Sequence, residues 1–527
     1  MSESVPEVLT IEEIYPPEFG AAQKQRWDHL LAMFEERYGV PADYVARSPG
    51  RVNIIGEHID YMLFPVLPMA VSSDFLLAVR VIPNTDTITI ANLSEKYPQR
   101  EFQVPAQGEL GIDATQLEWS NYFKSGLRGA LELLRGKGRP PKTVGMEVLA
   151  DGSVPSGAGL SSSAAFTCAS ALASLAAMGD GTFDKKELVN LAVVSERYVG
   201  VNSGGRVLRL TLPWRLEKGL TTVRWMDQSA SVLGVQGSAL YISFHPTLDA
   251  TPVAFPKTTP ELTFLIADTL VTADKHATGQ TNYNLRVVEC TLAAQILAKK
   301  LNLGQLPKDA GPLGNSFIGL MDKYFFGKDL PLDKKLEGLI EVTKKHLDKE
   351  EGYTREEMAE TLDLSVGELV QRCMVKFPIL ADHFQLRSRA LHVLQEAYRV
   401  VTFKTLLDSS TTSLSDPTDA NIPIQLGAIM NESHESCKNL YNCSCPELDT
   451  LCEVALSAGS YGSRLTGAGW GGCSVHLVPQ DKVQAVREAW RREYYEKKFP
   501  GIAKEKVESA IVASKPGSGA VLFRVGK

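Results

Sequence analysis

The sequence predicts a large globular protein that mixes helices and strands, of the α/β or α+β class. Apolar side chains alternate over some short segments and recur every three to four residues over others, which are the periods of strands and helices. Hydrophobic residues make up 44% of the chain and charged residues 22%, as in globular proteins. The 527 residues are enough for two or more domains with large cores.

The first half of the chain alternates between the two kinds of element. Trp27, Leu30 and Phe34 share one face at helical spacing, which predicts a helix over 21–38. Three more helices are expected, at 119–134, 161–177 and 185–198. Strands are expected at 44–47, 75–82, 87–92 and 145–150. The last strand leads into a turn rich in glycine and serine.

The second half mixes elements in the same way. Strands are expected at 239–244, 262–267, 474–478 and 520–525. Helices are expected at 283–300 and 482–497. The region 305–425 looks largely helical and charged, and ends in a loop of Ser, Thr and Asp at 409–419. The whole chain is therefore mixed α and β.

Composition excludes several classes of protein. The formal net charge of −7 does not suggest a nucleic-acid surface. No apolar run of about 18 residues occurs, so no membrane span is expected. The first residues, Met-Ser-Glu-Ser-Val-Pro-Glu, lack the basic and apolar regions of a signal peptide. The eight cysteines lack paired C-x2-C spacing and are expected to be reduced thiols. A cytoplasmic location is expected.

The most informative segment is 154–165, with the sequence Val-Pro-Ser-Gly-Ala-Gly-Leu-Ser-Ser-Ser-Ala-Ala. Glycines let the backbone curl so that several N–H groups converge, and a helix that begins there adds its positive end. Serine hydroxyls can donate to phosphate oxygens or ligate Mg²⁺. The segment predicts a nucleoside triphosphate site, although it lacks the lysine of a Walker A loop. The alternative is an ordinary strand–turn–helix link with a serine cap.

Two further segments concentrate polar or glycine residues. Residues 48–61 place Arg, Glu, His, Asp and Tyr within a short stretch, and such side chains suit sugar hydroxyls. The alternative is a polar surface loop. Residues 464–473 carry a G-x-G-x-x-G spacing, but a strand is expected after it where a dinucleotide site needs a helix. A glycine loop that lets the backbone approach sugar or phosphates fits better.

In their order and spacing the three segments resemble the signature motifs of the GHMP kinases. Gly-Glu-His-Ile-Asp-Tyr at 56–61 is similar to the galactokinase signature. Further matches occur at 119–124, 281–286, 430–434 and 444–449, and they are most similar to fungal galactokinases. The resemblance runs from about residue 15 to the end of the chain. It implies a two-domain α+β fold with the active site in the cleft between the domains. The domains are expected at 1–235 and 236–527.

The resemblance assigns the sugar site and the reacting groups. Glu57, His58 and Asp60 would hold the sugar, together with Gly204 and Tyr283. Asp227, in Met-Asp-Gln, would be the base or orienter of the C1 hydroxyl. Arg51 would lie beside Asp227, favour its ionised form and stabilise charge at the reacting centre. Phosphoryl transfer mainly needs such positioning and charge neutralisation.

The resemblance also assigns the nucleotide site, for ATP with Mg²⁺. The phosphates would be cradled by four residues, Gly157, Gly159, Ser161 and Ser162. Ser163 and Glu196 match positions that ligate Mg²⁺, with Ser163 also at the nucleotide. Trp119 matches a position near the adenine, and the alternative for it is a core tryptophan.

One segment departs from the family pattern. Residues 206–225 separate Asn-Ser-Gly-Gly from Met-Asp-Gln, and their removal restores the usual continuity. The segment carries five basic residues and one acidic residue, unlike its surroundings. The hypothesis is a retained intron or a gene-model error. If the segment is real, a displacement of about 1 Å at Asp227 would cost about a hundredfold in rate, although the fold could survive.

The resemblance implies ATP-dependent phosphorylation of galactose at C1, the first step of galactose breakdown, by a monomeric enzyme. Two alternatives stay open. One is an N-acetylgalactosamine kinase, because the C2 pocket is not readable from the sequence. The other is a sensor of galactose and ATP that binds a transcriptional repressor. Such sensors lack part of the serine-rich loop, whereas residues 159–165 are intact here, which favours catalysis.

Overall fold

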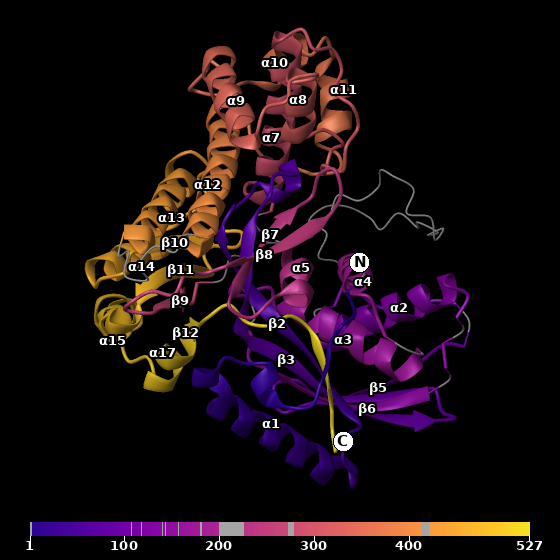
Figure 1. The fold of residues 1–527 in the computed structure, drawn as a ribbon. Helices are drawn as coiled ribbons and strands as arrows, with labels where there is room; N and C mark the ends of the chain where they lie inside the picture. The colour runs from indigo at the N-terminus through magenta and orange to yellow at the C-terminus, as the bar shows by residue number, and fades with distance from the viewer. Residues whose placement is uncertain are drawn as a thin grey trace.

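The computed structural model describes most of the chain and shows two larger sheets with a helical part above them (Figure 1). The described residues are 3–106, 108–116, 118–139, 141–142, 144–155, 157–179, 182–199, 226–271, 279–412 and 421–526. Segment 206–225, Gly204 and Ser156 lie outside them, so the prediction for Gly204 is not addressed by the structure.

The larger sheet has seven strands and joins the two ends of the chain. Its order is β1-β13-β2-β3-β6-β4-β5, with β1/β13 and β4/β6 parallel and the other pairs antiparallel. The strands are β1 (Glu7–Val8), β13 (Val521–Arg524), β2 (Tyr44–Ile55), β3 (Leu67–Pro83), β6 (Val144–Gly152), β4 (Thr87–Asn92) and β5 (Arg100–Gln103). The C-terminal strand therefore returns to the N-terminal sheet, as Figure 1 shows.

Helices cover both faces of this sheet because its strands are apolar on both sides. Val45, Leu76 and Ala78 pack with Trp27, Leu30 and Phe34 of α1 (Pro17–Tyr38). The alternate residues Ala46, Leu77 and Val79 point to the other face, as the period of two requires. That face is covered by α2 (Ser120–Gly136), α3 (Ser162–Met178), α4 (Lys185–Glu196) and α5 (Met226–Leu233).

The second unit is built on a four-stranded antiparallel sheet of order β10-β11-β9-β12. Its strands are β9 (Leu262–Asp268), β10 (Gly462–Thr466), β11 (Cys473–Pro479) and β12 (Ile511–Ser514). The helices beside it are α13 (Asn421–Asn439), α14 (Pro446–Ser457), α15 (Val483–Trp490), α16 (Glu496–Lys498) and α17 (Lys504–Ala510). A hairpin of β7 (Ser238–Ser243) and β8 (Asp249–Ala254) lies near the centre of the molecule (Figure 1).

The helical part at the top of Figure 1 surrounds the start of one long helix, α12. Its helices are α7 (Tyr283–Lys300), α8 (Phe317–Tyr324), α9 (Leu332–His346), α10 (Arg355–Thr361), α11 (Val366–Cys373) and α12 (Leu386–Thr412). α12 is 27 residues long and packs against α7, α9 and α13. It therefore connects the helical part to the unit that contains β10 and α13.

The predicted mixture of helices and strands is confirmed, and most elements lie where the sequence predicts them. The predicted loop at 409–419 is wrong at its start, because α12 continues to Thr412. The hydroxyls of Ser409 and Ser410 donate to carbonyl oxygens one turn back, so serines are accommodated inside this helix. No helix among the described residues is both long and apolar enough to cross a membrane.

Candidate active site

Arg51 connects the first predicted motif to the second. It lies on β2, is 4% exposed, and sits where the register of β2 with β3 shifts. Its backbone N–H donates to the carbonyl of Leu160 at 3.1 Å, and Nη1 donates to the carbonyl of Gly159 at 2.6 Å. Strand and loop are in direct contact, since a Cβ added to Gly50 would lie 2.8 Å from the Leu160 oxygen.

The same arginine holds the carboxylate of Asp227. Asp227 is in the first turn of α5, and its Oδ1 accepts from Arg51 Nε at 2.8 Å and lies 2.6 Å from Nη2 in an ion pair. The Arg51 side chain is 5% exposed and the Asp227 side chain 14%, so the pair is largely shielded from water. The two residues predicted to carry the chemistry therefore form one ion pair beside the glycine loop.

The glycine loop has the backbone that an anion cradle requires. Gly157 and Gly159 have φ of +79° and +80°, and Ser161 has φ of +56° at the start of α3. The Ser161 side chain does not cap α3, and its buried Oγ has no hydrogen-bond partner among the described residues. This disfavours the alternative of a serine cap. Ser162 and Ser163, the first two residues of α3, are half-buried. The orphaned hydroxyl and the helix N-terminus fit an anion.

The third motif packs directly on this loop. A Cβ on Gly467 would lie 3.0 Å from the carbonyl oxygen of Gly159, and a Cβ on Gly472 would lie 3.1 Å from that of Ala158. Both glycines have positive φ, +88° and +74°. The expected strand follows as β11, which confirms that the G-x-G-x-x-G spacing is not a dinucleotide fingerprint here. The glycines allow two backbones to touch.

The predicted sugar motif follows β2 in a tight turn. Gly56 has φ of +110° and His58 has φ of +60°. Because a carbonyl oxygen can only accept, His58 Nε2 donates to the carbonyl of Ala468 in the third motif, at 2.9 Å. Asp60 begins a one-turn 3₁₀ helix, Asp60–Met62, and is half-buried. The motif is therefore a structured turn, not the polar surface loop of the alternative interpretation.

Aromatic rings surround His58. The centroid of its ring lies 6.1 Å from Tyr61, 6.0 Å from Tyr283, 4.9 Å from Tyr441 and 5.7 Å from Trp470. Tyr283, at the start of α7, thus lies beside the Glu-His-x-Asp turn, next to the other residues expected to bind the sugar. The hydroxyls of Tyr61 and Tyr441 are hydrogen-bonded to each other, and Tyr61 Oη lies 3.4 Å from His58 Nδ1. These contacts fix the orientation of the imidazole.

Glu57 points into the protein. It is 3% exposed, and its Oε1 accepts from the backbone N–H of Gly467 at 2.9 Å and from Arg464 Nη1 at 3.5 Å. Burial raises the pKa of Glu57 against the opposite effects of Arg464 and the Gly467 N–H. The carboxylate therefore ties the sugar motif to the third motif.

The two predicted magnesium ligands lie on packed helices at the loop. Glu196 is the last residue of α4, and Ser163 is in the first turn of α3. Glu196 Oε2 accepts from Gln228 Nε2 at 2.5 Å, and Gln228 directly follows Asp227. A carboxylate and a hydroxyl are hard oxygen donors of the kind that Mg²⁺ prefers, so the donor set fits the ion.

Trp119 lies at the outer end of a stack of rings. Its ring stacks on Phe166 of α3 at 6.1 Å and 7°, and Phe166 stacks on Phe75 at 4.9 Å and 11°. Trp119 is half-buried, and its Nε1 donates to the carbonyl of Pro98 at 3.0 Å. It is therefore not a fully buried core residue, and the ring of Tyr97 lies 5.8 Å from it at a tilt of 48°.

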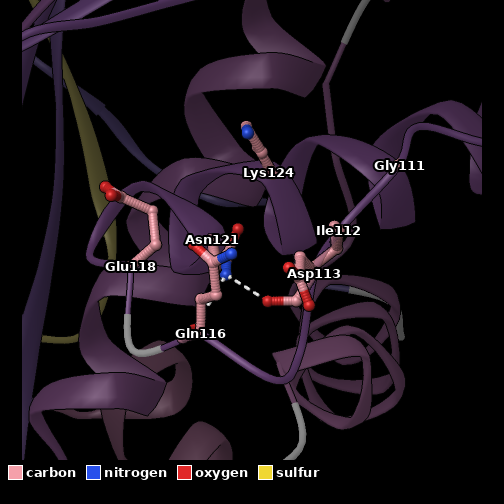
Figure 2. Close-up of a pocket in the computed structure, with 7 residues that line it drawn as sticks. All are labelled: Gly111, Ile112, Asp113, Gln116, Glu118, Asn121 and Lys124. Atoms are coloured by element: carbon pink, nitrogen blue, oxygen red, sulfur yellow. Dashed lines mark hydrogen bonds between the residues drawn. The ribbon is translucent and has the colours of Figure 1, made fainter.

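A hollow of about 460 Å³ lies over the start of α2 (Figure 2). Its polar lining is Asp113, Gln116, Glu118, Asn121 and Lys124, and Asn121 Nδ2 donates to the carbonyl of Asp113 at 2.9 Å. None of the predicted site residues lines it, although Glu118 directly precedes Trp119. The predicted residues instead gather where β2, the glycine loop and the third motif meet.

Several residues at this meeting point were missed by the sequence analysis. They are Tyr441, His392 and Glu396, whereas Arg464 and Trp470 lie within the predicted segment 464–473 but were given no role of their own. His392 and Glu396 stand four residues apart among the apolar residues of α12, and both are fully buried. Polar residues on an apolar helical stripe are a sequence signal for a buried contact. The sequence pattern does not identify which residues His392 and Glu396 contact.

Three family models match the chain. They describe a galactokinase galactose-binding signature at residues 32–81, a GHMP kinase N-terminal domain at 121–207 and a GHMP kinase C-terminal domain at 421–497. The N-terminal match ends at residue 207, within the first two residues of segment 206–225.

Known proteins match almost end to end. The galactokinase of Saccharomyces cerevisiae is 40% identical, over 98% of this chain and 99% of that protein. The galactokinase of Schizosaccharomyces pombe is 38% identical, over 96% of each. A Lactococcus lactis galactokinase complexed with galactose has a solved structure that covers 94% of this chain and 99% of its own, with a TM-score of 0.62 and 23% identity. That last similarity shows the shared fold.

Proposed function

The chain belongs to the galactokinases, within the GHMP kinases, and we propose from this that it transfers the terminal phosphoryl group of ATP to the C1 hydroxyl of galactose. It is a galactokinase, and ATP and galactose are its substrates. The observation that carries the assignment of the site is the Arg51–Asp227 ion pair held against the carbonyl of Gly159. That geometry supports a reacting carboxylate directly beside a phosphate cradle.

In this proposal galactose and the phosphates of ATP bind on either side of Arg51. Galactose is bound through its hydroxyl groups by the turn of Glu57, His58 and Asp60, together with Tyr283. The N–H groups of the glycine loop and the start of α3 hold the phosphates. Asp227 accepts or orients the proton of the C1 hydroxyl, and Arg51 keeps that carboxylate in place and offsets charge on the transferred group. Trp119 contributes a ring face to the adenine.

We include Mg²⁺ in the proposal, held by Ser163 and Glu196. When bound, the ion would neutralise charge on the phosphate oxygens. Gln228 orients the Glu196 carboxylate through its 2.5 Å hydrogen bond, which supports a ligand fixed in direction.

The proposal also includes a monomer that works in the cytoplasm, with domains divided near residues 235 and 236. All eight cysteines are unpaired thiols, which supports a reducing compartment.

The strand β13 is an exception to the division into domains at residues 235 and 236, because it lies in the C-terminal part of the sequence but belongs to the larger, N-terminal sheet. A repressor-binding role remains a separate proposal, to be tested by the dependence of repressor binding on both ATP and galactose.

The experiment is galactose-dependent ADP release, measured on the chain as written and on a variant without residues 206–225. Equal activity would make the segment a tolerated loop. Activity only in the deletion variant would support the splicing-error hypothesis, and sequencing the mature transcript would then decide it. No activity in either, with ATP and galactose still bound, would contradict catalysis and favour a sensor. Turnover of N-acetylgalactosamine over galactose would favour the second enzyme.

A further inference from the structure

We propose that Glu396 is a positioning residue for galactose, because its carboxylate holds the backbone of the turn that carries the sugar-binding side chains. The inference rests on the proposed function for its substrate. Its physical basis is a contact between two segments 340 residues apart, α12 and the turn after β2. In Figure 1, α12 extends from the helical part at the top toward the sheets.

One face of α12 contacts the turn at Gly56 and Glu57. His392, Glu396 and Val400 are spaced by four residues, which places them on one side of a helix, and all three are fully buried. Glu396 Oε1 accepts from the backbone N–H of Gly56 at 2.9 Å and from that of Glu57 at 3.3 Å. A Cβ on Gly56 would lie 3.1 Å from Val400 Cγ2, so the turn lies directly on the helix.

His392 completes the contact from one turn earlier. Its Nε2 lies 3.1 Å from the carbonyl oxygen of Glu57, which can only accept, so Nε2 carries a proton. Its Nδ1 lies 2.9 Å from Ser436 Oγ and accepts from that hydroxyl in the neutral ring. Burial lowers the pKa of His392 to about 4, which keeps the ring neutral near pH 7. The backbone N–H and the carbonyl of Glu57 are thus both bound by side chains of α12.

Arg464 joins Glu396 to the other side of the turn. Its Nη1 donates to the carbonyls of Asn53 and Ile54 at 3.0 and 3.2 Å and lies 3.5 Å from Glu57 Oε1. Its Nε donates to Ser433 Oγ at 3.1 Å, and that hydroxyl donates to Glu396 Oε1 at 2.7 Å. The turn is therefore held on its side chain and on its backbone by one buried network.

The network needs the negative charge of Glu396. Burial raises the pKa of a carboxyl group, but Arg399 and Arg464 outweigh burial here and lower the pKa of Glu396 to about 2. Arg399 Nε donates to Glu396 Oε2 at 2.9 Å. Loss of the charge would weaken the bonds to the turn, because hydrogen bonds to an ionised acceptor are about twice as strong as neutral ones. His58 and Asp60 follow within three residues and would shift with the turn.

The test is Glu396→Gln, which keeps the shape and one acceptor oxygen but removes the charge. We expect the KM for galactose to rise by about tenfold, while the KM for ATP stays within about twofold. We also expect faster amide exchange in a peptide that spans residues 50–63, measured without substrate. A purely structural role would lower the fraction of folded enzyme, hence the apparent kcat, and leave both KM values unchanged.

Two further variants keep the test decisive. Asp74→Asn is the matched control, since Asp74 is fully buried between Arg47 and Arg26 at 2.6 Å each. It should lower thermal stability without a selective change in the KM for galactose. Ser433→Ala removes the hydroxyl between Arg464 and Glu396 without changing charge, and should give a smaller effect in the same direction as Glu396→Gln. If Glu396→Gln does not fold, Ser433→Ala tests the positioning role in its place.

The outcomes separate the inference from the proposed function. An unchanged galactose KM, an equal rise in both KM values, or unchanged exchange at 50–63 in Glu396→Gln would overturn the positioning role. Absence of galactose-dependent turnover in the unaltered chain would instead contradict the proposed function. The exchange of residues 50–63 would then decide the role of Glu396 alone.

Discussion

Arg51 Nε donates to Oδ1 of Asp227 at 2.8 Å, and Nη2 of the same guanidinium lies 2.6 Å from that oxygen in an ion pair. The remaining nitrogen of the guanidinium, Nη1, donates to the carbonyl of Gly159 at 2.6 Å. One planar group therefore fixes the position of the carboxylate on α5 relative to the glycine loop. The role of Arg51 therefore depends on the planar shape of its guanidinium group as well as on its charge.

Arg51→Lys is expected to lower kcat by about 100-fold, because an ammonium group keeps the charge but cannot bind both partners in fixed directions. The KM for galactose should change much less. The measurement is ADP release at saturating substrates. Arg80→Lys is the control, because Arg80 forms a half-exposed ion pair with Glu147 at 3.0 Å, and this variant should have the kcat of the unaltered chain. A normal kcat in Arg51→Lys would contradict the role of the arginine.

Gly467→Ala is expected to weaken ATP binding as well as stability. The new Cβ would lie 3.0 Å from the Gly159 oxygen, so the glycine loop must move, and φ of +88° disfavours alanine by about 1 kcal/mol. Gly501→Ala is the matched control, with φ of +81° and open space around the Cβ. Thermal unfolding should show a loss in both variants, whereas calorimetry should show weaker ATP binding only in Gly467→Ala. If Gly467→Ala bound ATP as tightly as the unaltered chain, the glycine loop would have moved without any effect on ATP binding.

Trp119→Leu is expected to raise the KM for ATP by about 5- to 30-fold, because an aliphatic side chain cannot stack on a base. Trp119→Phe keeps a ring over Phe166 and should lose much less. Neither variant should change the KM for galactose, and initial rates at varied ATP and galactose measure both. An ATP KM that is the same in Trp119→Leu as in the unaltered chain would leave Trp119 with a packing role.

Stability is expected to fall as the pH is lowered from about 6.5 to 4. Burial lowers the pKa of His392 from 6.5 to about 4, so over this range the unfolded chain binds a proton that the folded chain does not. The loss from this residue is about 3 kcal/mol. His476 is shifted in the same direction, to about 3. Above pH 6.5 neither histidine makes stability depend on pH.

His392→Gln retains an N–H donor for the Glu57 carbonyl and removes the titrating group. Urea unfolding at several pH values should therefore show a shallower loss between pH 6.5 and 4 than in the unaltered chain. An identical slope in the two proteins would show that His392 is protonated in the folded state. Glu396 contributes to the pH dependence at lower pH. Its pKa is about 2 in the folded chain, so the protein loses the stability that this carboxylate provides only as the pH falls below about 4.5.

Local sequence determined the elements and the chemical character of the site. The helix at 283–300 and the strand at 87–92 have the bounds that periodicity predicts, because both periods are set by backbone geometry alone. The glycines at 157 and 159 predicted a curled loop, and their positive φ confirms it. The motif residues Arg51 and Asp227 were named as a pair through a family resemblance, and the structure brings them together.

The tertiary structure alone decided which backbones touch. No local pattern states that Gly467 meets Gly159, or that Glu396 binds a turn 340 residues earlier. Such contacts depend on how the sheets, the loop and α12 pack, and packing couples residues far apart in the chain. A buried carboxylate in an apolar helical stripe signals that some partner exists, because an unpaired buried charge is too costly. Only the folded chain identifies that partner as the sugar-binding turn.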